Sequence, residues 1–115
     1  MDDHTTAGKY APRDDVDGGW PDGEPRPGGA PYTRYAVGIA RALRDERARL
    51  GLRSDRALER HVGLTHGTFV RALRGDGVVD GMTISKIETA LGRRVLPDPL
   101  PREGERTGNW AAGGS

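Results

Sequence analysis

The feature that most constrains this chain is a proline-free stretch of 65 residues, 32–96, which lies between two segments rich in proline and glycine. Residues 1–31 hold 5 Pro and 6 Gly but only 7 hydrophobic residues, and residues 97–115 hold 3 Pro and 4 Gly. Such segments bury too little apolar surface to offset the entropy of ordering. We therefore predict a folded domain over 32–96, a disordered acidic arm over 1–31 and a disordered tail over 97–115.

The composition excludes several classes of protein. The chain contains no cysteine, which excludes disulfides, thiolate metal sites and a cysteine nucleophile. Its three histidines lack metal-ligand spacing, and no phosphate loop or nucleophile elbow is present, so we expect no enzyme, metal or cofactor. No apolar run approaches the roughly 18 residues of a membrane span. The acidic start Met1-Asp2-Asp3-His4 does not resemble a secretory signal, and we expect a cytoplasmic protein.

Charge divides the chain at the same two boundaries. The arm carries 3 basic and 7 acidic residues, the domain 13 basic and 7 acidic, and the tail 2 basic and 3 acidic. The total of +1 therefore conceals a domain of +6 behind an arm of −4. Because 16 of the 18 cations are arginine, which pairs well with phosphate and guanine, the domain favours a nucleic-acid partner. The alternative is that the arginine bias reflects a GC-rich genome.

Helical periodicity runs through the whole domain. The first helix is expected over about 33–50, with Thr33 as its N-cap and Gly51 at its left-handed end. Its buried face carries residues at three- and four-residue multiples: Ala36, Ile39, Leu43 and Leu50. No segment alternates with a period of two for long enough to make a strand. The predicted fold class is all-α.

Three shorter helices follow the first. Ser54 is the candidate N-cap of the second helix, which ends at Gly63, and Thr65 is that of the third, which ends at Gly75.

The last helix is expected over about 82–91, after the glycine-rich connection 75–81. We expect Val95 and Leu96 to fold back onto the core. Met82 and the pair Val78-Val79 are expected to pack inside the domain rather than to form an interface.

The second and third helices are joined by only Gly63, Leu64 and Thr65. A turn of this length with a glycine, between two helices, is typical of a helix-turn-helix. Four apolar residues are spaced to fill the wedge between the helices: Leu58, Val62, Leu64 and Phe69. Burial of that face leaves five residues pointing outward from the third helix: His66, Gly67, Val70, Arg71 and Arg74.

With its flanking helices, this stretch resembles the lambda-repressor-like (Xre-type) family of bacterial and phage DNA-binding domains. The resemblance covers about residues 35–96. It includes Leu43, Arg44, Arg47, Gly51 and Leu52 before the turn, and Thr83, Ile84, Ile87, Leu91 and Gly92 after it. The resemblance implies a compact domain of four to five helices whose helix 66–74 enters the major groove of double-stranded DNA.

The resemblance also implies which residues contact DNA: Thr65, His66, Gly67, Thr68, Arg71 and Arg74 at the third helix, with Arg44 and Arg56 outside it. His66, Gly67, Thr68 and Arg71 hold base-reading positions, whereas Thr65 and Arg74 hold backbone positions. Arg71 is the foremost base reader because arginine to guanine is the commonest specific contact. Arg44 and Arg47 contact phosphate, or instead pair with Asp45 and Glu59.

Several positions depart from the family pattern. Asp55 stands where the family usually has glutamine; since a carboxylate repels phosphate, that contact is expected to move to Arg56. Glu59 stands where the family usually has alanine, and Arg53 is one residue extra. Gly67 supplies no side chain at a reading position. These departures predict modest or unusual sequence specificity.

Two functions from different classes follow. The first is a sequence-specific regulator, a repressor that occupies an operator as a homodimer or on repeated half-sites and is nucleoid-associated when bound. The second is a protein-interaction module, such as an antitoxin or adaptor, whose partner binds the fold or its tails. In either, an arm of −4 beside a domain of +6 can fold back over the DNA face and compete for it.

Overall fold

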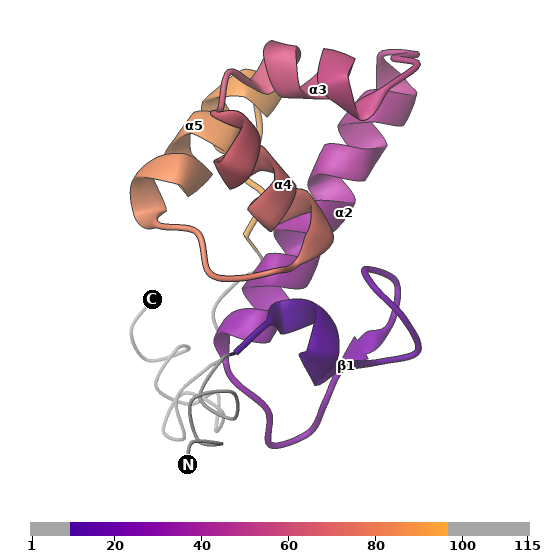
Figure 1. The fold of residues 1–115 in the computed structure, drawn as a ribbon, viewed down its shortest axis with the longest axis vertical. Coiled ribbons are helices and arrows are strands. Elements are labelled where there is room, and N and C mark those ends of the chain that lie inside the picture. The colour runs from indigo at the N-terminus through magenta and orange to yellow at the C-terminus, as the bar shows by residue number, and fades with distance from the viewer. Residues whose placement is uncertain (1–9, 97–115) are drawn as a thin grey trace, which may run out of the picture.

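The computed structural model describes residues 10–96, and its longest element is the helix α2, Tyr32–Arg49 (Figure 1). Three shorter helices follow: α3, Asp55–Val62; α4, His66–Arg74; and α5, Gly81–Leu91. The segment before α2 adds η1, a 3-10 helix over Pro12–Asp15, and two strands, β1, Val16–Asp17, and β2, Glu24–Pro25. This segment lies around the N-terminal end of α2, and the three shorter helices gather along the rest of it (Figure 1).

Polar caps and glycines set the limits of the shorter helices. Ser54, Thr65 and Asp80 each accept a hydrogen bond from the backbone N–H three residues further on, at 3.1, 3.4 and 2.8 Å. The caps predicted at Ser54 and Thr65 are thus confirmed. All three helices end at glycines with a left-handed φ of 82°, 69° and 70°: Gly63, Gly75 and Gly92. The turn between α3 and α4 therefore takes only three residues.

One apolar core joins the four α-helices. Its fully buried members include Ile39 and Leu43 from α2, Leu58 from α3, Phe69 from α4 and Ile87 from α5. The chain after α5 returns to this core as predicted, because Val95 is 6% exposed and Leu96 packs against it.

The connection between α4 and α5 is only partly buried. Val79 is 5% exposed, and its backbone N–H donates to the Tyr32 hydroxyl at 3.1 Å. Val78 and Met82, by contrast, are 54% and 69% exposed. The packing predicted for these residues therefore holds for Val79 alone, since the hydrogen bond to Tyr32 turns that residue, and not its neighbour, into the core.

The start of α2 differs from the prediction. The helix begins at Tyr32, and Pro31 precedes it without a side-chain cap. Thr33 lies inside the first turn and is fully buried. Its hydroxyl donates to Asp15 Oδ2 at 2.5 Å and lies 2.6 Å from the Tyr10 hydroxyl. Thr33 consequently anchors the preceding segment instead of capping the helix.

Residues 10–31, hereafter the docked arm, are ordered against the helices, where the sequence predicts disorder. Pro12 and Val16 are buried, and the Arg13 backbone N–H donates to the Gly75 carbonyl at 3.1 Å. Several of its contacts with the helices are hydrogen bonds, which a count of hydrophobic residues does not reveal. The disorder predicted for residues 1–9 and 97–115 lies outside the described residues.

The docked arm also introduces strand pairing into a fold predicted to be all-α. β1 and β2 pair antiparallel, with Val16 opposite Pro25 and Asp17 opposite Glu24. Two residues per strand are too few to produce a visible alternation in the sequence. The described chain is mostly helical with this one small sheet, and none of its helices is both long and apolar enough to cross a membrane.

Candidate functional site

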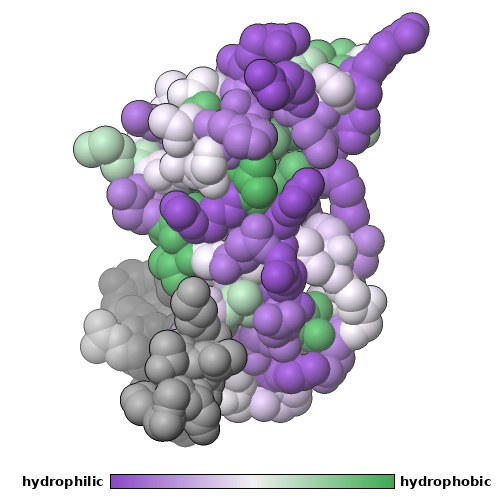
Figure 2. Space-filling view, viewed as in Figure 1, coloured by the Kyte–Doolittle hydropathy of each residue, from purple (hydrophilic) through white to green (hydrophobic). Residues whose placement is uncertain are grey.

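α4 has one face in the core and one at the surface. Phe69 and Ala72 are buried, whereas five of the residues predicted to contact DNA are exposed: Thr65, His66, Gly67, Arg71 and Arg74. Thr68 is half-buried, and so is Val70, which packs against the core instead of pointing outward as expected. The structure therefore gathers six of the eight predicted site residues at one helix. Figure 2 shows that the molecule presents a largely hydrophilic surface in this view, with hydrophobic side chains between hydrophilic ones near its centre.

The N-terminal end of α4 is held by hydrogen bonds. The Thr65 hydroxyl caps the helix and donates to Thr68 Oγ1 at 2.9 Å. His66 Nδ1 lies 2.9 Å from Glu59 Oε1, which ties the first residue of α4 to α3. His66 nevertheless keeps a side chain that is 68% exposed. A Cβ placed on Gly67 would meet no atom within 4 Å, so the protein itself does not require glycine there.

The C-terminal half of α4 carries two exposed arginines, Arg71 and Arg74, on the same side of the helix. The stem of Arg71 lies beside Gly77, where a Cβ would come within 3.3 Å of Arg71 Cδ. Neither guanidinium has an ion-pair partner among residues 10–96. Two solvated cations three residues apart are thus available for an external anion.

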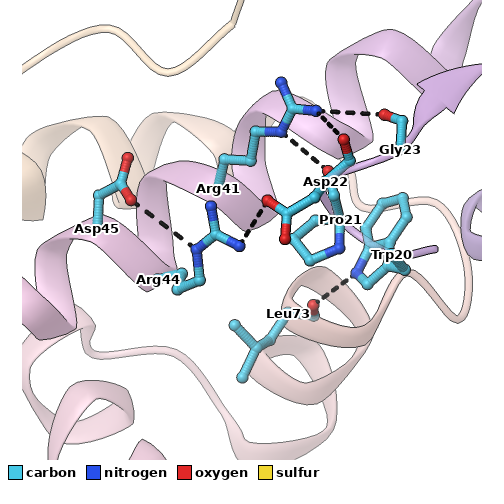
Figure 3. A network of polar contacts seen from close by, with 8 residues as sticks. All are labelled: Trp20, Pro21, Asp22, Gly23, Arg41, Arg44, Asp45 and Leu73. Atoms are coloured by element: carbon cyan, nitrogen blue, oxygen red, sulfur yellow. Dashed lines mark hydrogen bonds and ion pairs between the residues drawn. The ribbon is translucent and has the colours of Figure 1, made fainter. Parts of the chain in front are cut away.

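Arg44 and Arg56 lie outside α4 and differ in their surroundings. Arg56, in the first turn of α3, is exposed and has no ion pair within the described part of the chain. Arg44, on α2, donates to Asp22 Oδ1 at 2.7 Å and lies 3.9 Å from Asp45 Oδ1 (Figure 3). The expected pairing with Asp45 is thus present, but the shorter contact is to a residue of the docked arm.

The two acidic departures from the family pattern both have internal partners. Asp55 Oδ1 lies 3.3 Å from Arg47 Nη1, which weakens its repulsion of an approaching phosphate. Glu59 pairs with His66 rather than with Arg47. Within residues 10–96, the exposed arginines of α3 and α4 have no ion pair.

The docked arm contributes two site residues that the sequence did not single out, Arg13 and Trp20. The Trp20 indole N–H donates to the Leu73 carbonyl at 2.9 Å (Figure 3). Arg13 pairs with Asp76. Together with Arg44 and Arg74 they border a hollow of about 460 Å³ between the arm, α2 and α4. The sequence signal that could have revealed this site is Trp20, a lone tryptophan in a segment poor in hydrophobic residues.

A buried carboxylate on α2, also missed from the sequence, joins α2 to α3. Glu46 is 3% exposed and accepts hydrogen bonds from Arg49 Nε at 3.0 Å and Arg49 Nη2 at 2.9 Å. His61 Nε2 lies 3.0 Å from the same carboxylate. The bonds from Arg49, assisted by His61, hold the pKa of Glu46 below its ordinary value despite burial.

The chemistry available at this surface is charge and hydrogen bonding. Within residues 10–96, no group of three His, Asp or Glu side chains is arranged to hold a metal ion. Comparisons of the chain with protein-family models, with curated proteins and with solved structures find no match. What α4 offers a ligand is therefore a set of hydroxyl, imidazole and guanidinium groups on a helix whose ends are fixed by Thr65 and Gly75.

Proposed function

We propose that the chain is a sequence-specific DNA-binding regulator whose α3, Gly63 turn and α4 form a helix-turn-helix of the lambda-repressor-like (Xre-type) kind. The observation that carries the proposal is the exposed face of α4, where Arg71 and Arg74 lie together without an ion pair to any of residues 10–96. In this proposal α4 enters the major groove, and the regulator represses by occupying its operator.

The residues of α4 divide between base edges and the DNA backbone. His66, Thr68 and Arg71 reach base edges, and Arg71 contributes most because its guanidinium can donate two hydrogen bonds to guanine. Thr65 and Arg74 at the two ends of the helix contact phosphates, which fix register without reading sequence. Gly67 lets the helix backbone approach the groove closely.

Two arginines outside α4 extend the phosphate contacts. Arg56 is available as it stands, at the start of α3. Arg44 joins once the DNA backbone displaces its contact with Asp22. Because one small module makes few phosphate contacts, the regulator binds as two copies or on repeated half-sites.

The experiment that tests the proposal is selection of binding sites from a randomised duplex pool at two salt concentrations. The full chain is used, because the docked arm packs against α2 and α4. An enriched motif is expected, with affinity that falls steeply as salt rises.

Substitutions separate the two roles of α4. Arg71→Ala is expected to weaken binding to the enriched motif about 10- to 100-fold and to relax its preference at one position. Arg74→Ala is expected to weaken all duplexes alike and to reduce the salt slope by about one. Arg93→Ala is the matched control, since this exposed arginine follows α5 and lies outside α4. It should leave both quantities unchanged.

Two outcomes would overturn this proposal in different ways. Binding that depends on salt but yields no enriched motif would leave a nonspecific DNA binder. No binding at either salt concentration would assign the α4 face to a protein partner instead, as in an antitoxin or adaptor.

A further inference from the structure

We infer that the hollow between the docked arm, α2 and the C-terminal end of α4 binds a small organic anion with a flat apolar body. Nucleoside monophosphates and aromatic carboxylates belong to this class. The inference concerns a different ligand from the DNA proposed above and stands whether or not DNA binds.

The size and walls of the hollow suit such a ligand. Its volume is about 460 Å³, within the range of roughly 300–1,000 Å³ that is usual for small-molecule sites. Trp20, Pro21 and Leu73 line it with apolar surface, and most of its charged lining is arginine. An apolar wall with a few charged groups is the usual composition of a site that orients a small ligand.

The apolar wall is formed before any ligand arrives. The Trp20 indole is fixed by its hydrogen bond to the Leu73 carbonyl. It also lies so close to Gly75 that a Cβ there would come within 2.6 Å of the ring. Arg41 holds the next stretch of the arm by donating to the carbonyls of Pro21, Asp22 and Gly23 at 2.9, 3.0 and 3.2 Å (Figure 3). The free-energy cost of ordering this side of the site on ligand binding is therefore small.

The charges around the hollow favour an anion. Of its three arginines, Arg13 pairs with Asp76 and Arg44 pairs with Asp22. Arg74 has no ion pair within residues 10–96, so it is the group that an anion would neutralise. The one carboxylate in the lining, that of Asp55, lies 3.3 Å from Arg47. A phosphate or carboxylate on Arg74 would form charge-assisted hydrogen bonds that a neutral ligand lacks.

A flat free anion fits these walls better than a phosphate of duplex DNA does. The backbone of a duplex presents sugars and phosphates with its bases stacked inside, so it offers nothing to the apolar side of the hollow. A nucleoside monophosphate or a naphthoate places a ring there while its anionic group reaches Arg74.

Calorimetric titration of the full chain with two matched pairs tests the inference: AMP against adenosine, and 2-naphthoate against 2-naphthamide. In Trp110→Phe, Trp20 is the sole tryptophan, and its fluorescence reports binding at this site. We expect at least one acid to bind and to change this fluorescence. Its neutral counterpart should bind with an affinity lower by about tenfold or more.

Arg74→Gln is expected to weaken binding of the acid at least tenfold, whereas Arg93→Gln is expected to leave its affinity unchanged. Because Arg74 is exposed, the variant should keep the unfolding midpoint of the parent chain. Failure of both acids to bind, equal binding of the neutral counterparts, or unchanged binding by Arg74→Gln would each overturn the inference. DNA binding is measured separately by the site selection described above, so failure of either proposal can be told from failure of the other.

Discussion

Glu46 is a buried residue whose charge is expected to stabilise this fold. Its carboxylate is buried and held by Arg49 and His61, and these contacts keep its pKa lower in the folded than in the unfolded chain. Such a group stabilises the fold above its unfolded pKa and loses that contribution as pH falls through the folded pKa. Glu46→Gln should therefore lower the free energy of unfolding by about 1–3 kcal/mol at pH 7. The difference should shrink between pH 5 and pH 3.

Urea unfolding of both proteins at pH 7 and pH 3.5 measures this difference. Asp45→Asn is the matched control, since Asp45 is exposed and lies 3.9 Å from Arg44; its effect should stay within about 0.5 kcal/mol. If the difference between the parent and Glu46→Gln were the same at both pH values, the ionised carboxylate would not be its cause.

Gly67 is a residue at which stability and DNA binding should respond in opposite directions. Alanine there meets open space, so Gly67→Ala should stabilise α4 by about 0.5–1 kcal/mol. If the helix backbone approaches DNA at this point, the same methyl group should weaken binding to the enriched motif. Gly81→Ala, also in the first turn of a helix and in open space, should stabilise the fold without affecting binding. Unfolding midpoints and duplex affinities of the two variants give the comparison, and equal affinities would exclude close approach at Gly67.

At the scale of elements, the C-terminal end of α4 is joined to the docked arm through Gly75. Its φ is 69°, and the Trp20 ring fills the space of a Cβ, so Gly75→Ala faces both backbone strain and a clash. We expect a loss of about 2–4 kcal/mol in the free energy of unfolding. Gly63→Ala, at the end of α3 with a φ of 82° but open space, should cost only about 1–2 kcal/mol.

The same pair of glycines measures how tightly the arm is docked. In a Trp20→Ala background the clash is gone, and Gly75→Ala should cost no more than Gly63→Ala does. Chemical denaturation of the parent chain, Trp20→Ala, Gly75→Ala and the double variant gives the coupling free energy between Trp20 and Gly75. Equal costs for Gly75→Ala with and without Trp20 would mean that the indole does not occupy this position in solution.

The elements that the sequence predicts well are those with local signals. Ser54 and Thr65 cap α3 and α4 because a hydroxyl followed by three helical residues is a local arrangement. Thr33 has the same local sequence character, yet its hydroxyl donates a hydrogen bond to Asp15, 18 residues away, and the helix begins at Tyr32. Likewise, Glu46 and Arg49 can be paired from their spacing on one helix, but their burial beneath His61 cannot.

At the scale of the whole molecule, composition predicts a division that the fold does not follow. The arm holds few hydrophobic residues, so its composition predicts that the entropy of ordering it is uncompensated. In the structure, hydrogen bonds hold it instead. Arg41 donates to backbone carbonyls of the arm, Thr33 donates to Asp15, and the Trp20 indole donates to the Leu73 carbonyl. Contacts of this kind have no period in the sequence. The helical surface with Arg71 and Arg74 could be predicted, whereas the hollow could not, because three of its eight lining residues belong to the arm.

The position of the docked arm determines which of its carboxylates lie near the residues proposed to contact DNA. Its carboxylates do not spread over α4; Asp22 alone forms an ion pair with one of the residues proposed to contact DNA, Arg44, at 2.7 Å. Removing the whole arm would unpack Trp20 and Thr33, so a single substitution is the sharper test. Asp22→Asn should tighten duplex binding about two- to fivefold at low salt, since an exposed ion pair is worth at most about 1 kcal/mol.

Asp17→Asn provides the control for this effect, because Asp17 is an acid of the same arm whose partner, Arg26, is also in the arm. Both variants change the net charge by one, so a general electrostatic effect would move both affinities equally. If only Asp22→Asn tightens binding, and the gain fades as salt screens the pair, the arm restrains DNA binding through Arg44. Unchanged affinity in Asp22→Asn at every salt concentration would mean that Arg44 takes no part in holding DNA.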